Sequence, residues 1–187
     1  MLRNTLLVIA ALYGSIPSFS NSYAFGLKDF LPSQTFIVPQ NGMYPELPGG
    51  SNFRCDNYAY SEISNIKYGD VVAFRQQWKG QEYLFVWRVV ALPGDQVVTN
   101  GQDLHINQKL IVRSIVRSEQ DFDIYQERNK NVEYFVAFSK RVKLSVPEVD
   151  LIVPSGHVFV MGDNRYDALD SRALGPVTFK EIVSKKI

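Results

Sequence analysis

The chain has 187 residues, 45% of them hydrophobic and 13% aromatic, which is enough for one compact domain with a packed core. Twenty Lys and Arg against nineteen Asp and Glu leave a formal net charge of +1, so the chain lacks the basic field that attracts nucleic acid. We therefore expect no nucleic-acid partner and predict that the partner is a protein or an extended peptide.

The N-terminus has the pattern of an export signal. Arg3 precedes the apolar run of residues 6–12, and a polar stretch with Pro17 leads to Ser22-Tyr23-Ala24, a small-x-small cleavage site. The apolar run is well short of the ~20 residues that span a bilayer. The sequence predicts a signal peptide at residues 1–24 and an exported protein, periplasmic or otherwise extracytoplasmic. An uncleaved anchor that keeps the protein at the membrane is the alternative.

From Phe25 onward the chain shows short apolar or alternating runs separated by Gly, Pro, Asn and Asp, which are typical of strands. Abundant Val, Ile and aromatic residues favour the same interpretation, so the predicted fold class is all-β with antiparallel strands. The predicted strands are residues 35–38, 71–74, 83–91, 96–99, 104–106, 109–112, 132–138 and 157–161. Asn100-Gly101 and Pro93-Gly94-Asp95 predict turns, and residues 177–182 predict a strand or a short helix.

The segment from residue 113 to 143 is richer in Gln, Glu, Arg, Lys and Asn than its surroundings and carries several aromatic residues. This composition indicates an insertion on a β scaffold, either a solvated hairpin or a partner-binding surface.

One cysteine, Cys55, excludes an intramolecular disulfide. We expect Cys55 to be a small buried residue, with a free reactive thiol as the alternative. Two His and one Cys offer no metal-ligand spacing, so neither a metal nor another cofactor is predicted.

Three stretches, taken in order, resemble the type I signal peptidase family. They are residues 37–47 (IVPQNGMYPEL), residues 69–95, which contain GDVV and WRVVALPGD, and residues 161–172, which contain MGDNR and DSR. The resemblance implies a signal-peptidase-like fold: a β core of residues 25–95 plus 156–187 and a second β region inserted at residues 96–155.

The last stretch is the most specific of the three. The resemblance implies that its charged residues tie strands and loops together, and two Arg with two Asp in one short segment suit bidentate hydrogen bonding. The predicted structural motif consists of Gly162, Asp163, Asn164, Arg165, Asp170, Ser171 and Arg172.

The catalytic positions that the resemblance implies do not carry the expected residues. The family uses a serine nucleophile and a buried lysine base, and these map to Gly42 and Trp87. Glycine has no nucleophile, and the indole nitrogen is only a donor. Two supporting hydroxyl positions map to Gln40 and Ala168. The sequence therefore predicts a signal-peptidase-like protein without catalytic residues at this site.

Other residues are candidates for a replacement nucleophile or base. They are Ser33, Ser51, Ser171, Cys55, Lys67, Lys79, His105 and His157. None lies at a spacing that matches a known catalytic pair. An active serine endopeptidase of the signal peptidase I type, processing preproteins or pilin with non-standard residues, is therefore the alternative function.

The leading hypothesis is a non-hydrolytic binding or assembly factor. Strand addition depends on backbone hydrogen bonds and does not need catalytic residues, so a partner peptide is expected at Met43, Tyr44, Pro45 and Trp87. A pilus subunit or a secretion or conjugation component is the expected partner. Three roles are open for Trp87: it anchors a peptide, it blocks the pocket that holds the lysine in the family, or it only fills space in the core.

Two further possibilities concern the cell envelope. A structural component of a secretion or conjugation apparatus is a third function class. The family's apolar surface near the site rests on the bilayer, so the resemblance implies peripheral membrane contact at Phe36, Ile37 and Met43, with core packing as the alternative.

Overall fold

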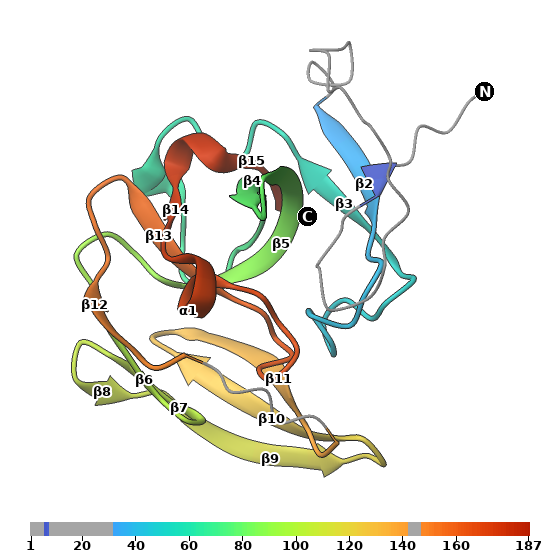
Figure 1. Ribbon diagram of the computed structural model, residues 1–187, viewed down its shortest axis with the longest axis vertical. Coiled ribbons are helices and arrows are strands. Elements are labelled where there is room, and N and C mark those ends of the chain that lie inside the picture. The colour runs from blue at the N-terminus through green and yellow to red at the C-terminus, as the bar shows by residue number, and fades with distance from the viewer. Residues whose placement is uncertain (1–5, 8–31, 142–146) are drawn as a thin grey trace.

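The computed structural model describes residues 6–7, 32–141 and 147–187 (Figure 1). Apart from Leu6–Leu7, the predicted signal peptide at residues 1–24 lies outside the described residues. In the described parts of the chain, no helix has the length and apolar character that crossing a membrane requires.

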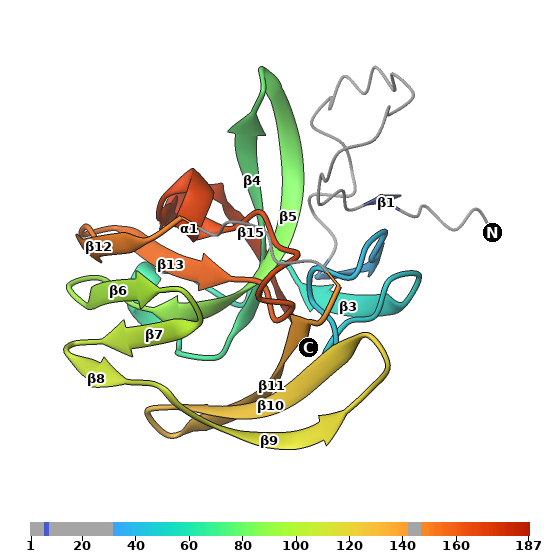
Figure 2. The same cartoon turned by 60° about the horizontal axis from the view of Figure 1, so that its bottom comes forward.

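Three β-sheets form the described part of the molecule (Figures 1 and 2). The largest has the strand order β1-β2-β3-β15-β4-β5-β13-β14. Its strands are β1 (Leu6–Leu7), β2 (Ser33–Ile37), β3 (Asn52–Asp56), β4 (Val71–Trp78), β5 (Gln81–Ala91), β13 (His157–Met161), β14 (Val177–Thr178) and β15 (Ile182–Lys186). Every described strand pairing is antiparallel except that of β1 with β2. The all-β prediction is confirmed.

The two smaller sheets come from the middle of the chain. The order β12-β6-β7-β8 contains β6 (Gln96–Asn100), β7 (Asp103–Ile106), β8 (Lys109–Leu110) and β12 (Val149–Ile152). The order β11-β10-β9 contains β9 (Val112–Ser118), β10 (Phe122–Asn129) and β11 (Val132–Ser139). The described helical segments are one turn each: α1 (Ser171–Leu174), η2 (Ile63–Asn65) and η3 (Phe179–Glu181).

The hairpin of β4 and β5 forms the centre of the largest sheet. Its turn is at Lys79 and Gly80, which have positive φ angles of 49° and 76°. Residues 83–91 of β5 are all buried, which fits a run of Val, Leu, Phe and Trp in a strand that is covered on both faces. Trp87 lies in this run.

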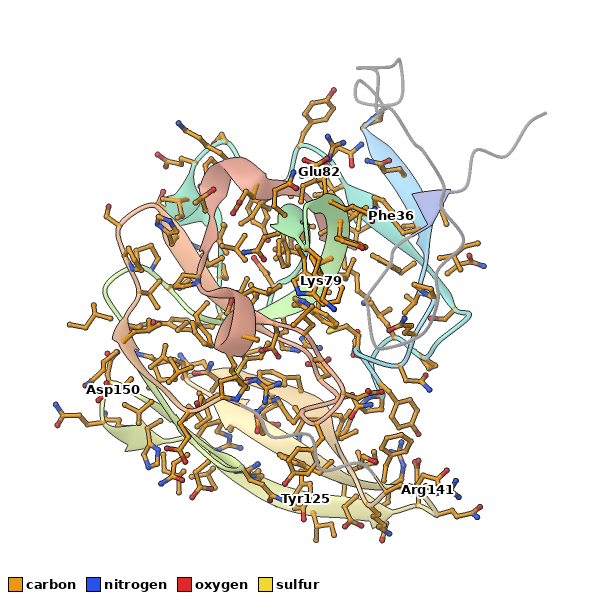
Figure 3. The ribbon with its side chains drawn as sticks, in the orientation of Figure 1. Phe36, Lys79, Glu82, Tyr125, Arg141 and Asp150 are labelled. Carbon is orange, nitrogen blue, oxygen red and sulfur yellow. The ribbon has the colours of Figure 1, made fainter. Side chains whose placement is uncertain are left out.

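The main core cluster lies around this hairpin. Phe36 is 1% exposed and stacks on Phe53 at a ring-centroid distance of 5.5 Å. Cys55 is fully buried in the same cluster, as expected, and burial raises its pKa to about 11. By contrast, Arg141 and Asp150 of the middle segment reach toward solvent (Figure 3).

A second core cluster joins the largest sheet to the sheet of β6. Val90 of β5 and Phe159 of β13 pack with Val97 of β6 and Leu104 of β7. The strands of residues 96–152 therefore share a core with the rest of the chain. The predicted domain boundaries at residues 95/96 and 155/156 fall in the connections between these groups of strands.

The segment predicted as a solvated hairpin or a partner surface is the packed sheet of β9, β10 and β11. Two backbone hydrogen bonds attach β11 to the GDNR stretch: Ala137 N donates to Asp163 O (2.8 Å), and Arg165 N donates to Ala137 O (2.9 Å). The β11 edge of this sheet is consequently tied to the loop that follows β13.

Candidate functional site

The loop between β2 and β3 carries the first predicted site residues. Tyr44 N donates to Asn41 O (2.9 Å), and Leu47 N donates to Met43 O (2.8 Å). The Asn41 side chain accepts a hydrogen bond from Gly49 N (2.8 Å). These bonds fold the segment back on itself and fix the backbone at residue 42.

Gly42 lies directly against the indole of Trp87. A Cβ atom built on Gly42 would lie 2.5 Å from Trp87 Cη2 and 2.7 Å from Cζ3. Carbon atoms pack at ~3.5–4.0 Å, so no side chain fits here while the indole is in place. The carbonyl of Gly42 accepts a hydrogen bond from Asn164 N (3.0 Å), which links this loop to the GDNR stretch.

Gly162 and Ala168 complete the surroundings of the indole. A Cβ atom built on Gly162 would lie 2.7 Å from Gly42 O and 3.2 Å from Trp87 Cζ3, and it would overlap Ala168 Cβ. We refer to Gly42, Trp87, Gly162 and Ala168 as the Trp87 cluster. Gly42 and Gly162 thus leave the volume that the indole fills, and Ala168 lies against Gly162.

The Trp87 cluster brings together three of the four positions that the sequence analysis singled out. Gln40, the fourth, is partly buried in the same loop, where its backbone lies beside Gly49. Gly162 was predicted only as part of the structural motif. Its role beside the indole could not be inferred from the motif, because it depends on how closely two loops approach.

The burial of Trp87 corrects part of the predicted peptide-binding set. Trp87 and Met43 are each 2% exposed and belong to the main core cluster, so neither side chain is available to a peptide. Trp87 Nε1 is buried without a hydrogen-bond partner in the described structure, which indicates that packing determines the position of the indole. Phe36 is also buried, so core packing explains Phe36 and Met43 in place of membrane contact.

Tyr44 and Pro45 remain partly exposed. Tyr44 contacts the inserted region: its hydroxyl donates to Glu119 Oε2 (2.6 Å), and its ring lies 5.0 Å from that of Phe122. Arg117 Nε in turn donates to Glu119 Oε1 (2.7 Å). The β9–β10 connection therefore packs against the loop that carries Gly42.

The charged residues of the structural motif make bidentate pairs, two of which are with residues outside the motif. Asp163 accepts two hydrogen bonds from Arg88 of β5, at 2.8 and 2.6 Å. Arg165 donates to both carboxylate oxygens of Glu127 on β10, at 2.8 and 2.5 Å. Asp163 and Arg165 therefore pair with residues of other elements. All four side chains of these two pairs are buried.

Only Asp170 and Arg172 pair with each other, at 2.8 and 2.7 Å. Asp170 is also the N-cap of α1 and accepts a hydrogen bond from Gly162 N (3.0 Å). Ser171 Oγ accepts from Val160 N (3.0 Å). This part of the motif fixes the backbone on which Gly162 and Ala168 lie.

Glu46 connects the Gly42 loop to two other strands. Its carboxylate lies 2.9 Å from Lys186 Nζ on β15 and 3.9 Å from an Arg88 nitrogen on β5. Burial alone would raise the pKa of Glu46, but the hydrogen bond and charge of Lys186 and the charge of Arg88 lower it below the usual value.

The candidate replacement residues are dispersed over the described structure. Ser51 Oγ donates to Pro48 O (2.6 Å), Ser171 accepts from Val160, and Ser33 accepts from Arg54 (3.3 Å). Lys67 Nζ donates to Ser64 O (3.1 Å), Lys79 lies over the Trp78 ring (4.4 Å), His105 is on β7, and His157 Nδ1 lies 2.9 Å from Ser155 O. None of these contacts joins a serine hydroxyl or the Cys55 thiol to a lysine or histidine side chain.

A family model described as "Signal peptidase, peptidase S26" matches residues 22–187. The chain belongs to this family. Signal peptidase I of Pseudomonas fluorescens is 30% identical over 162 residues, which cover 78% of this chain and 56% of the relative. Signal peptidase I of Pseudomonas aeruginosa is 29% identical over 185 residues, which cover 85% and 64%.

Signal peptidase I of Bacillus caldolyticus is 29% identical over 150 residues, which cover 80% of this chain and 75% of the relative. The chain thus spans 56% to 64% of the length of the two Pseudomonas relatives. A crystal structure of a signal peptidase I from Enterococcus faecalis is similar at 24% identity and a TM-score of 0.40, covering 64% of this chain and 95% of that one.

Within the signal peptidase family fold, two site residues were not singled out from the sequence. Arg88 lies next to Trp87 in the recognised WRVV stretch, but nothing in that stretch names Asp163 as its partner. Glu127 lies 38 positions from Arg165 in a segment without a recognised motif, so no local signal indicated it.

Proposed function

We propose that this member of the signal peptidase family does not hydrolyse peptides and instead binds an extended segment of a partner protein outside the cytoplasm. The observation that carries the proposal is the fit of the Trp87 indole against Gly42, at the positions where the family resemblance places the base and the nucleophile. A pilus subunit or a component of a secretion or conjugation apparatus is the expected partner.

The chemistry of these two positions supports the absence of hydrolysis. Gly42 offers no hydroxyl or thiol, and a general base must be able to accept a proton, which the indole nitrogen of Trp87 cannot do. A serine hydroxyl at position 42 would have to occupy the space of Trp87 Cη2 and Cζ3. The two residues therefore depend on each other, and a single substitution does not rebuild the pair.

The edge of β2 supports the binding part of the proposal. Val38 donates to Ser51 O (2.9 Å) and accepts from Gly50 N (2.6 Å), so its backbone groups face β3. Because these groups alternate along a strand, the N–H and C=O of Ile37 face the opposite side, where β1 pairs with β2 and where a partner strand would pair in place of β1. This edge leads directly into the Gly42 loop.

A fluorescent peptide that spans the leader and cleavage region of a pilin precursor tests the proposal. We expect it to bind the chain and to remain intact by mass spectrometry. Ile37→Pro removes the N–H on the side of β2 that faces away from β3, where the partner strand would pair, and it keeps the bonds to β3. We expect this variant to weaken binding at least about tenfold, because several hydrogen bonds of the added strand share that register.

Ile37→Val is the matched control, because it shortens the same side chain and keeps the N–H. Equal affinity for the Ile37→Pro and Ile37→Val chains would refute binding at the β2 edge. Cleavage of the peptide at one bond, lost when one residue of the chain is replaced, would support the endopeptidase alternative.

A further inference from the structure

β9 is the outermost strand of the three-stranded sheet and lies at the bottom of the molecule in Figures 1 and 2. Within the described residues, no strand pairs with the side of β9 that faces away from β10. The preceding strand β8 has such a neighbour, because β7 pairs with it and Ile111 N donates to Leu104 O (2.8 Å). The cover that β7 provides therefore ends where β9 begins.

The hydrogen bonds of β11 determine which backbone groups of β10 face β9. Both backbone hydrogen bonds of Ala137 go to the GDNR stretch, so its N–H and C=O face away from β10. Because the facing direction alternates along a strand, the groups of Val136 face β10, where Tyr125 is the opposite residue. The groups of Gln126, the next residue of β10, therefore face β9.

The same alternation identifies the groups on the open side of β9. Gln126 lies opposite Ser114, so the N–H and C=O of Ser114 face β10. The N–H and C=O of Arg113 and Ile115 consequently face the open side. Val116 has no opposite residue on β10, which makes it a bulge, so the regular part of the open side ends at Ile115.

The side chains along this strand are apolar for such exposed positions. The described residues include eight large apolar side chains that are well exposed, and four of them are Leu110, Val112, Ile115 and Val116, with exposed fractions between 47% and 68%. Single exposed apolar residues need no explanation, but a run of them beside unpaired backbone groups is typical of a site where another strand adds. We refer to residues 109–118 as the β9 edge.

The charges of the β9 edge indicate the kind of strand that fits. The edge contains Lys109, Arg113 and Arg117 and no Asp or Glu. Arg113 already pairs with Asp103 (3.1 Å), whereas Lys109 is exposed and forms no ion pair within the described parts of the chain. Arg117 is half exposed, and its pair with Glu119 is a surface pair of the kind that contributes little. A strand with acidic residues is therefore complementary, whereas a second copy would add only like charges.

We propose that the β9 edge binds an extended segment of a partner protein in which apolar and acidic residues alternate. The segment adds a fourth strand to the sheet of β9, β10 and β11, and its backbone pairs with Arg113 and Ile115. Its apolar side chains pack beside Val112 and Ile115, and its carboxylates lie near Lys109 and Arg117. The β9 edge belongs to a different sheet from β2, so this inference does not rest on the proposed function.

A fluorescein-labelled peptide of eight alternating Val and Glu residues tests the proposal by fluorescence anisotropy with the full chain. At low salt we expect it to bind at least about tenfold more tightly than a peptide of alternating Val and Lys, and added NaCl should reduce this preference. Equal affinity for the two peptides would overturn the proposal. So would the absence of Val-Glu binding at a chain concentration of roughly 1 mM.

A proline variant tests the place of binding. Ile115→Pro removes an N–H on the open side and keeps the bonds to β10, and Ile115→Val is the matched control that keeps this N–H. We expect Ile115→Pro to weaken binding of the Val-Glu peptide at least about fivefold, because it removes one hydrogen bond of the added strand. Ile37→Pro on β2 should leave the affinity unchanged. Equal affinity for the two Ile115 variants, or a loss of binding in Ile37→Pro, would overturn the proposal.

A charge variant leaves the backbone unchanged and keeps the test valid if Ile115→Pro does not fold. We expect Lys109→Gln/Arg117→Gln to weaken binding of the Val-Glu peptide at least about threefold. Lys67→Gln/Lys180→Gln is the matched control, because it removes the same charge from exposed positions elsewhere. Equal weakening by the two double variants would overturn the proposal. Sedimentation velocity should show no self-association that Ile115→Pro abolishes, since such association would replace the acidic partner by a second copy.

Discussion

The contact between Gly42 and Trp87 joins two positions that are 45 residues apart and that both lack the side chains expected from the family resemblance. The indole takes the space in which a Cβ atom of residue 42 would lie, and a Cβ atom on Gly162 would also lie within 3.2 Å of Trp87 Cζ3. The indole of Trp87 fits only because residue 42 has no side chain. A side chain at position 42 and the indole at position 87 therefore exclude each other in this arrangement.

A double-mutant cycle measures this fit. Gly42→Ala should destabilise the chain by ~1–3 kcal/mol, because it inserts a methyl group into a filled space. In a Trp87→Leu background the same change should cost under ~1 kcal/mol, because the overlapping ring atoms are gone. Urea unfolding of the four chains gives the coupling energy, expected to be at least ~1 kcal/mol. The control pair is Gly42→Ala with Phe138→Leu, a change at a buried residue of β11 outside the Trp87 cluster, and the two costs should be additive. Additive costs in the Trp87 cycle would contradict the fit.

The lowered pKa of Glu46 predicts a pH effect. A carboxylate whose pKa is lower in the folded chain stabilises the fold fully above its usual value of 4.5, and this contribution falls as the pH falls through the lower value. Glu46→Gln should therefore destabilise the chain at pH 7 and make little difference near pH 3. Urea unfolding of both chains at the two pH values measures the difference. A constant difference would show that Lys186 and Arg88 do not act on Glu46 through its charge.

At the scale of single residues, the sequence predicted which positions matter better than which atoms they contact. Gly42, Trp87 and Ala168 were identified because each follows or precedes a recognisable motif. The sequence did not predict that Trp87 is packed in the core. A tryptophan can either anchor a ligand or fill a core, and the sequence is the same in both cases. The partners Arg88 and Glu127 depend on the approach of distant strands, which no local pattern encodes.

The sheet of β9, β10 and β11 depends on a buried ion pair. Arg165 and Glu127 are 2% and 0% exposed, and a nitrogen of Arg113 lies 3.9 Å from the same carboxylate. Glu127→Gln would leave two guanidinium groups around a neutral amide. Since an unpaired buried charge costs several kcal/mol, we expect a loss of ~3–5 kcal/mol in the free energy of unfolding.

Glu133→Gln is the control for this prediction. Glu133 is on neighbouring β11 and pairs with Arg128 on the exposed side, so its loss should cost no more than ~1 kcal/mol. Urea unfolding of the two variants compares them. Similar costs would mean that the Arg165–Glu127 pair does not hold this sheet to the rest of the molecule.

At the scale of elements, the apolar strands were predicted and the polar ones were missed. β5 and β13 are apolar runs. β6 and β7 form the hairpin predicted from Asn100-Gly101, but Asn100 ends β6 and the two connecting residues are 101 and 102. β10 was missed because its buried positions include Glu127 and Asn129, so no hydrophobic alternation is visible. β3 does alternate between exposed and buried residues, but it has only five residues. The segment predicted as a strand or a short helix contains both, β14 followed by η3.

At the scale of the whole molecule, the three sheets meet at the loop that follows β13. Asp163 reaches β5, Arg165 reaches β10, and the backbone of Asn164 binds the Gly42 loop. One short stretch therefore connects the core, the inserted region and the candidate site. None of these three contacts uses a side chain at position 42 or 87.

The absence of hydrolysis is tested most directly by a single-turnover assay. The purified chain, in excess over a pilin precursor or another preprotein, is incubated between pH 6 and 9, and the products are followed by mass spectrometry. We predict that the precursor remains intact while it is bound. Cleavage at one defined bond, abolished by replacing one residue of this chain, would contradict it.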